Sequence, residues 1–162
     1  MTKEAEGEWY YQQVDLGFNY RMTELQAALG ISQMERLDNF VAMRHQFQKR
    51  YEELLNNLPI ITHYQGPDSY SAFHLYPIQI DLENISKNRA QIFNELRKSG
   101  IGVNVHYIPI HIQPYYRQLG FKEGSFPNAE NYYSRAISLP LFHNMTEDQQ
   151  VEVCNALRSA LQ

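Results

Sequence analysis

A long stripe of apolar residues begins at Leu25, two residues after Thr23. Thr23 and Gln26 fit a capping box, in which the threonine oxygen accepts a hydrogen bond from a helical amide and the glutamine side chain reaches back. Apolar residues then recur three or four positions apart, which predicts a connecting helix over residues 23–57, about 50 Å long. Gly30 is a point where this helix could bend or split. Because such a helix is long for one compact domain, we expect it to span two bodies.

Three segments after residue 58 have the polarity pattern of strands. Residues 72–81 alternate between apolar and polar side chains, and Pro77 within them favours an edge position or a bulge. Residues 101–108 predict a second strand, and the stretch ISLPLF predicts a short third one.

Helix signals lie between and after these strands. Ser86 is the expected cap of a helix that Gly100 ends in a left-handed conformation. The stretch QPYYRQLG predicts a short helix, Pro127 opens another, and Thr146 starts a second capping box ahead of a terminal helix. Together these patterns predict an α+β domain over residues 58–162, with a three- or four-stranded sheet backed by helices.

Composition excludes several classes of protein. The net charge is -4, so binding to nucleic acid by bulk positive charge is excluded. No apolar run approaches the ~18 residues of a membrane span, and the first residues have no apolar signal-peptide core. Cys154 is the single cysteine, so no internal disulfide can form, and we expect a cytoplasmic protein.

The approach to the long helix, GFNYR, places an amide and a guanidinium at the positive end of that helix. A helix N-terminus offers free amides and a partial positive charge, which favour an anion. Asn19 could donate to a phosphate oxygen, and Arg21 could bind one bidentately. The alternative is that both side chains only cap and solvate the turn.

A second candidate region is the stretch NVHYIPIHIQPYY, which holds His106 and His111. Further ligands at zinc-like spacing are lacking, so a zinc site is disfavoured and no metal is expected. The chain has 12 tyrosines, many of them between residues 107 and 133, and buried tyrosines usually need a partner for the hydroxyl. This region is therefore expected at a surface or a cleft. Ordinary packing and a polar cleft for a hydroxyl-rich ligand both remain open.

The order of four segments resembles the C-terminal part of the sugar aminotransferases of the DegT/DnrJ/EryC/StrS family. The resemblance runs from about Gly7 to the end and implies fold type I of the pyridoxal 5'-phosphate (PLP) enzymes. Residues 1–22 would lead in from a large PLP-binding domain, and the long helix would connect it to the small one. The branch of pseudaminic acid biosynthesis is the most similar. The four segments are GFNYRMTELQAALG, FHLYPIQI, VHYIPIHIQPYYRQLGF and FPNAENYYSRAISLPLF.

The resemblance also implies a reaction and a division of roles. The family moves an amino group from glutamate to a keto-sugar nucleotide, and this branch uses a UDP-linked 4-keto-6-deoxy sugar. Asn19 matches a residue that reaches across a homodimer to the PLP phosphate. Five residues match the substrate side of the site or the strand that leads into it: Arg21, His106, Tyr107, His111 and Tyr115.

One departure from the family pattern concerns the Schiff-base lysine. Lys3, Lys49, Lys87, Lys98 and Lys122 lie in contexts unlike the family's lysine motif. Schiff-base chemistry needs a positioned, deprotonated lysine, so no catalytic residue is assigned to this chain. We expect an isolated C-terminal fragment that is inactive alone and does not retain PLP. The alternative is a stand-alone ligand-binding or dimerisation module without catalysis.

Overall fold

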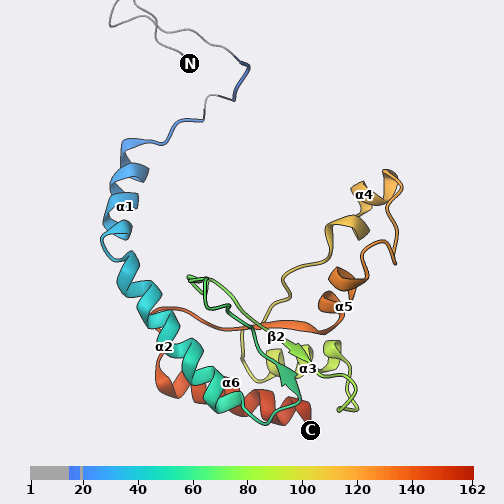
Figure 1. The fold of residues 1–162 in the computed structure, drawn as a ribbon. Helices are drawn as coiled ribbons and strands as arrows, with labels where there is room; N and C mark the ends of the chain where they lie inside the picture. Colours follow the sequence, from blue (N-terminus) through green and yellow to red (C-terminus); the bar gives the residue numbers. More distant parts are fainter. Residues whose placement is uncertain (1–14, 19) are drawn as a thin grey trace, which may run out of the picture. The chain divides into compact units, whose positions relative to one another are not determined.

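The computed structural model describes residues 15–18 and 20–162, which form two compact units. The first unit ends at Leu37, and the second begins at Asp38. Figure 1 traces the elements in chain order. The second unit holds the sheet and every labelled helix except α1, so it contains the predicted α+β domain.

The single helix predicted over residues 23–57 is wrong, because the chain forms two helices there. α1 (Glu24–Met34) begins at the predicted capping box, and α2 (Leu37–Leu55) follows after a two-residue turn. Gly30 lies inside α1, so the interruption is not at the glycine. Every described residue of α1 is at least partly exposed, whereas α2 buries three side chains.

The turn after α1 has a local cause in the hydrogen bonds of Glu35 and Arg36. The Glu35 amide bonds to the Ile31 carbonyl over 3.2 Å, but the Arg36 amide turns to Gln33 over 3.1 Å. The Arg36 side chain donates to the Ser32 carbonyl over 3.4 Å. These bonds tighten the last turn and satisfy carbonyls that a continuing helix would have used.

The sheet is antiparallel and has three strands in the order β1-β2-β3. The strand predicted at residues 101–108 does not form, and only a single bridge joins Asn104 to Ser138. The other two predicted strands exist in shorter form. The strands are β1 (Ile60–Ile61), β2 (Tyr76–Ile80) and β3 (Ala136–Leu139).

Pro77 lies in the central strand, so the predicted edge position is wrong. Its register partner is Ser138, whose backbone exchanges hydrogen bonds of 2.8 and 3.3 Å with Asn104 on the opposite side. At this pair the β3 backbone therefore points away from β2 and needs no donor from proline. On the other edge, the pairing of β1 ends at Ile61 opposite Gln79, before it reaches Pro77.

Four helices complete the second unit, and their signals were largely predicted. The cap of α3 is Asn88, whose side chain accepts from the Gln91 amide over 3.0 Å, and not the predicted Ser86. Gly100 ends α3 with a φ of 81°, as expected for a left-handed cap. The helices are α3 (Arg89–Lys98), α4 (Pro114–Gln118), α5 (Pro127–Arg135) and α6 (Glu147–Leu161), the last with the predicted Thr146 capping box.

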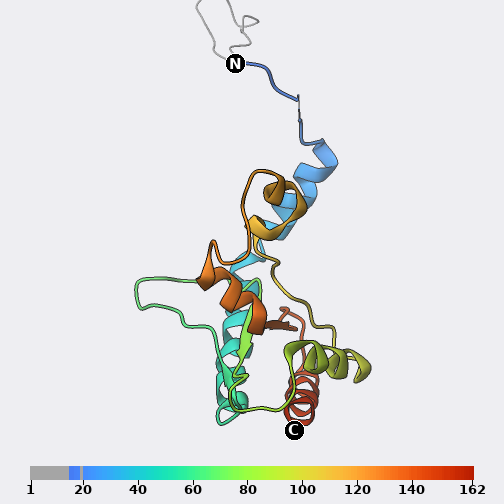
Figure 2. The same ribbon diagram turned by 90° about the vertical axis from the view of Figure 1, so that its right-hand side faces the viewer.

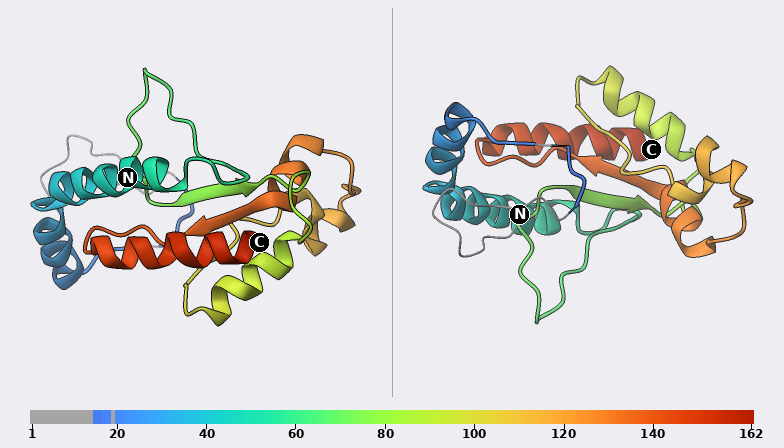
Figure 3. Two further views of the ribbon diagram at one scale, coloured as in Figure 1. Left: turned by 90° about the horizontal axis from the view of Figure 1, so that it is seen from below. Right: turned by 90° about the horizontal axis from the view of Figure 1, so that it is seen from above.

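The core lies where α2, α3 and α6 meet β2 and β3. Figure 3 shows α2 and α6 running on either side of these strands, with α3 next to α6. Tyr51 of α2 stacks on Tyr76 of β2 at 4.9 Å between ring centroids. The buried Gln150 side chain of α6 donates to the Phe47 carbonyl of α2 over 2.7 Å. Apolar burial and a few aimed polar contacts therefore fix these helices against the sheet.

Candidate functional site

Residues 107–126 leave the sheet and return to it, and we call this excursion the arm. It contains the 3₁₀ turn η1 (Ile110–Ile112) and α4. Figures 1 and 2 both place α4 on the side of the sheet away from α6. The predicted surface character of the tyrosine-rich stretch is confirmed, because these large side chains of the arm are exposed: Tyr107, Ile108, Ile110, Tyr115, Tyr116, Leu119, Phe121 and Phe126.

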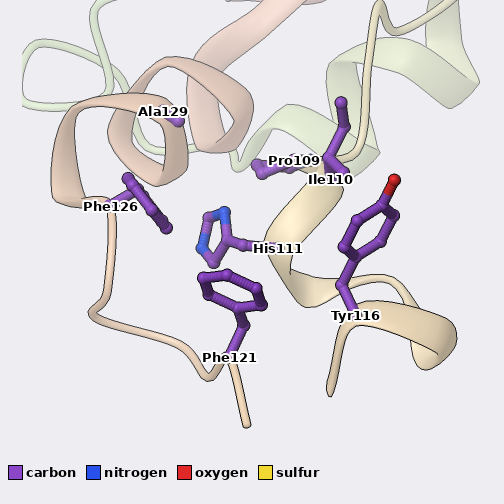
Figure 4. Close-up of a pocket in the computed structure, with 7 residues that line it drawn as sticks. All are labelled: Pro109, Ile110, His111, Tyr116, Phe121, Phe126 and Ala129. Carbon is purple, nitrogen blue, oxygen red and sulfur yellow. The ribbon is translucent and has the colours of Figure 1, made fainter. Parts of the chain in front are cut away.

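A pocket of about 370 Å³ lies in the arm, against the start of α5. Figure 4 shows the His111 ring between the rings of Phe121 and Phe126. The His111 and Phe126 rings are 4.9 Å apart between centroids. The pocket has the size and the apolar character of a small-molecule site. Its lining residues are Pro109, Ile110, His111, Tyr116, Phe121, Phe126 and Ala129.

His111 is buried and its polar edge is held by a carboxylate. Its Nε2 lies 2.7 Å from Oε1 of Glu130, in the first turn of α5. Glu130 also accepts from the Gly124 amide at 2.8 and 2.9 Å and from the Phe126 amide at 3.3 Å. The Gly124 bond first, and the His111 bond next, lower the pKa of Glu130 below its ordinary value of 4.5.

His106 directly precedes the arm and Tyr107 is its first residue, and neither of them lines the pocket. The His106 Nδ1 atom is 2.8 Å from the Ser138 hydroxyl of β3, and its ring meets Tyr107 edge-on at 4.5 Å. Tyr107 itself is 70 % exposed. The structure thus anchors His106 to the sheet and leaves Tyr107 accessible. Their substrate-side role stays a prediction.

Tyr115 and Tyr116 are neighbours on α4 but differ in their relation to the pocket, and the substrate-side role of Tyr115 stays a prediction. Tyr115 is 66 % exposed and outside the pocket lining, whereas Tyr116 lines the pocket. The two rings meet edge-on at 5.3 Å. Sequence reasoning also missed Phe121, Phe126 and Glu130. An acidic residue in the first turn after Pro127 was the one available signal for Glu130.

The other predicted site residues belong to the first unit. Arg21 lines an open hollow of about 700 Å³ with Tyr20, Met22 and Gln26, just ahead of α1. Asn19 lies outside the described residues. The anion site ahead of α1 therefore stays a prediction.

Among residues 15–18 and 20–162, no three His, Cys, Asp or Glu side chains cluster as metal ligands. Within the same residues, no helix combines the length and apolarity needed to cross a bilayer.

The sequence was compared with protein-family models, and the model of the DegT/DnrJ/EryC1/StrS aminotransferase family matches residues 1–158. The chain belongs to this family. Its curated relatives include the spore coat polysaccharide biosynthesis protein SpsC of Bacillus subtilis, 40 % identical over 95 % of this chain. GDP-perosamine synthase of Vibrio cholerae is 30 % identical over 89 % of it. The chain spans 40 % and 39 % of the length of these two relatives.

Solved structures of the family share this fold. Helicobacter pylori PseC, an aminotransferase involved in the biosynthesis of pseudoaminic acid, matches with a TM-score of 0.84 and 26 % identity. The match covers 97 % of this chain and 42 % of that one. A Streptococcus pneumoniae neighbour was solved in a PLP form. The α+β fold expected from the family resemblance is therefore confirmed.

The described lysines lie outside the two hollows that hold the predicted site residues. Lys49, Lys98 and Lys122 are exposed, and Lys87 pairs with Glu95 at 2.7 Å. Among the described residues, no lysine lines the His111 pocket or the Arg21 hollow. A Schiff-base lysine must lie in a shielded pocket beside the cofactor. These four lysines do not meet that requirement.

Proposed function

We propose that this chain is the C-terminal part of a PLP-dependent sugar-nucleotide aminotransferase and supplies the substrate side of its site. The match of the family model to residues 1–158 carries the proposal, because it includes both the Arg21 and the His111 regions. The lysine and most of the PLP site would belong to protein outside this chain. The isolated chain is then inactive.

For the amino acceptor, we propose a UDP-linked 4-keto-6-deoxy sugar, with glutamate as the donor. The protein would be a UDP-4-amino-4,6-dideoxy-N-acetyl-β-L-altrosamine transaminase. The similarity to PseC supports this choice. The relative GDP-perosamine synthase favours a GDP-linked sugar instead. The full-length protein should be assayed with both keto-sugar nucleotides, and turnover of the GDP-linked sugar alone would refute the UDP assignment.

The segment around Arg21 and the arm with His111 would have different functions in the full-length enzyme. Arg21 would bind the charged diphosphate, since a guanidinium matches phosphate oxygens bidentately. Asn19 would donate to the PLP phosphate of the partner subunit. The aromatic side chains of the arm and His111 would exclude water around the sugar nucleotide.

These roles predict that substitutions in the two regions impair different steps: PLP binding or sugar-nucleotide binding. Asn19→Ala should weaken PLP retention by about 1–3 kcal/mol, the range for a hydrogen bond to a charged group, or roughly tenfold to a hundredfold in affinity. Arg21→Ala and His111→Ala should leave PLP bound and raise KM for the sugar nucleotide. The cofactor spectrum and steady-state kinetics of each variant separate the two outcomes. Unchanged PLP retention in Asn19→Ala would refute the phosphate role.

The cofactor assignment has its own test on the 162-residue chain. After incubation with PLP and dialysis, we expect no absorbance near ~410–430 nm, because no lysine is positioned for the cofactor. A band that persists and disappears on borohydride treatment would show that this chain holds PLP itself.

We also propose that the enzyme is a homodimer and that α1 contributes to a buried interface. Leu25 and Leu29 of α1 are mostly exposed, as are Ile31 and Met34. Exposed apolar side chains of this size favour association. Light scattering of the isolated chain should show mass that rises with concentration, and Leu25→Lys with Leu29→Lys should reduce it. A monomer at all concentrations would refute the proposal for this surface.

A further inference from the structure

We infer that Glu130 is a positioning residue that holds the walls of the His111 pocket in one arrangement. This inference rests on the proposed function, because the pocket is taken as part of the sugar-nucleotide site. Its own evidence is the set of contacts that the Glu130 carboxylate makes. These contacts join three segments of the arm and α5.

One carboxylate serves three donors from different places in the chain. Oε1 of Glu130 lies 2.7 Å from His111 Nε2 in η1, 2.8 Å from the Gly124 amide and 3.3 Å from the Phe126 amide. Oε2 also lies 2.9 Å from the Gly124 amide. An ionised carboxylate accepts at both oxygens and donates nothing, so it suits a site where every neighbour is a donor.

The segments joined in this way are the segments that form the pocket. His111 and Phe126 both line it and both bond to Glu130, while Phe121 precedes the Gly124 turn. Gly124 has a φ of 86°, in the left-handed region that favours glycine, so the turn directs its amide at the carboxylate without side-chain strain. Glu130 therefore sets the orientation of the histidine ring and of the loop that carries both phenylalanines.

Other contacts of the arm are mostly local, such as the bonds of the Phe121 amide to the Tyr116 carbonyl at 3.4 Å and of the Ser125 amide to the Lys122 carbonyl at 3.2 Å. The Arg117–Glu123 ion pair at 2.8 Å lies on the same loop, but both side chains are more than half exposed. Exposed pairs of this kind contribute little to order, since water screens them and both side chains lose entropy. Glu130 is only a quarter exposed and its partners include buried His111. The carboxylate of Glu130, unlike the loop ion pair, joins η1, the loop and α5.

The test compares Glu130→Gln and Glu130→Ala with Glu123→Gln as the matched control. Glutamine keeps the length and one acceptor oxygen but places an NH₂ group where Oε2 accepts from Gly124. Alanine removes all four contacts. Glu123→Gln makes the same chemical change on the same loop without touching the pocket.

The first readout is amide hydrogen exchange of the 162-residue chain. We expect Gly124 and Phe126 to exchange about tenfold faster in Glu130→Ala, with a smaller change in Glu130→Gln, because local opening controls exchange. The helices of the core should keep their exchange rates. Unchanged exchange at Gly124 and Phe126 in Glu130→Ala would overturn the inference, whatever reaction the protein catalyses.

The second readout is the kinetics of the full-length enzyme with its sugar nucleotide and glutamate. A positioning role raises KM for the sugar nucleotide by about tenfold in Glu130→Ala, leaves kcat within about twofold, and is partly rescued in Glu130→Gln. An equal loss of kcat/KM for the sugar nucleotide and for glutamate would overturn the inference. A KM for the sugar nucleotide no higher than that of Glu123→Gln would also overturn it. Absence of aminotransfer by the unaltered enzyme would instead refute the proposed function, and the exchange result would still decide whether Glu130 orders the arm.

Discussion

Leu157 on α6 and Leu119 in the arm are the same side chain in opposite surroundings. Leu157 has no exposed surface, whereas Leu119 is 61 % exposed. Leu157 belongs to a continuous core formed by α2, α3, α6 and the sheet. In the arm, exposed aromatic side chains surround one pocket that a single carboxylate helps to order.

The difference in burial distinguishes the core, which stabilises the fold, from the arm, whose surface is accessible to a ligand. Apolar burial contributes roughly 25 cal/mol per Å² and needs no particular partner, so the core tolerates variation that keeps its volume. The arm depends on a few directed hydrogen bonds, which fix geometry but add little stability each. Substitutions in the two regions should therefore affect different measurements.

The largest expected effect is in the core. Leu157→Ala should lower the free energy of unfolding by about 2–5 kcal/mol, because it removes buried methyl groups and leaves a cavity. Leu119→Ala should change it by less than about 0.5 kcal/mol, as surface substitutions usually do. Urea denaturation of the chain followed by far-UV circular dichroism measures both. Similar losses in the two variants would contradict the division between core and arm.

A second test compares the chemical access to each region. Cys154 is fully buried, and burial raises the pKa of its thiol to about 11, so both access and thiolate formation are disfavoured. We expect its reaction with a disulfide reagent near pH 8 to be at least about a hundredfold slower than that of a cysteine introduced at Ser125, since core opening must come first. The rate for Cys154 is measured in the native chain. The rate for the introduced cysteine is measured in the Ser125→Cys, Cys154→Ala variant, which has no other thiol. Equal rates would show that the core is open to solvent.

A smaller effect is expected from one polar contact inside the core. Gln150 is fully buried and donates to the Phe47 carbonyl at 2.7 Å. Gln150→Ala leaves that carbonyl buried without this donor, which should cost about 1–3 kcal/mol in the free energy of unfolding. The control is Gln118→Ala on exposed α4, where the same change should be nearly neutral. A neutral Gln150→Ala would mean that this hydrogen bond adds nothing to the packing and to the arginine contacts that also join α2 to α6.

The pattern of the core could be predicted from the sequence because periodicity records which side chains are buried. The terminal helix and its Thr146 capping box are examples. The interruption at Glu35 and Arg36 could not be predicted in this way, since the apolar spacing continues across it. Nor could the central place of Pro77, which depends on how far β1 extends. Both failures concern hydrogen bonds that side-chain polarity does not encode.

The candidate site was predicted only in part for a similar reason. His111 was identified, and it does lie in a pocket. Glu130 was missed, because it is 19 residues from His111 in sequence and two of its donors are backbone amides, which no residue type reveals. Tyr116 was not predicted as a pocket residue, because the sequence does not show which of two adjacent rings on α4 lines the pocket.

The smallest expected effect is the response of the arm to acid. The pKa of Glu130 is lowered in the folded chain, so its ionised form contributes stability above the ordinary value of 4.5, and that contribution is lost as pH falls through the folded pKa. The amide signals of Gly124 and Phe126 should therefore move together below pH 4.5, while those of β3, which has no titratable side chain, stay nearly constant. Glu130→Gln has no carboxylate at this position and should show no such step, whereas Glu123→Gln should keep it. A step that persists in Glu130→Gln would assign the titration to another group and would remove the pH evidence that separates the arm from the core.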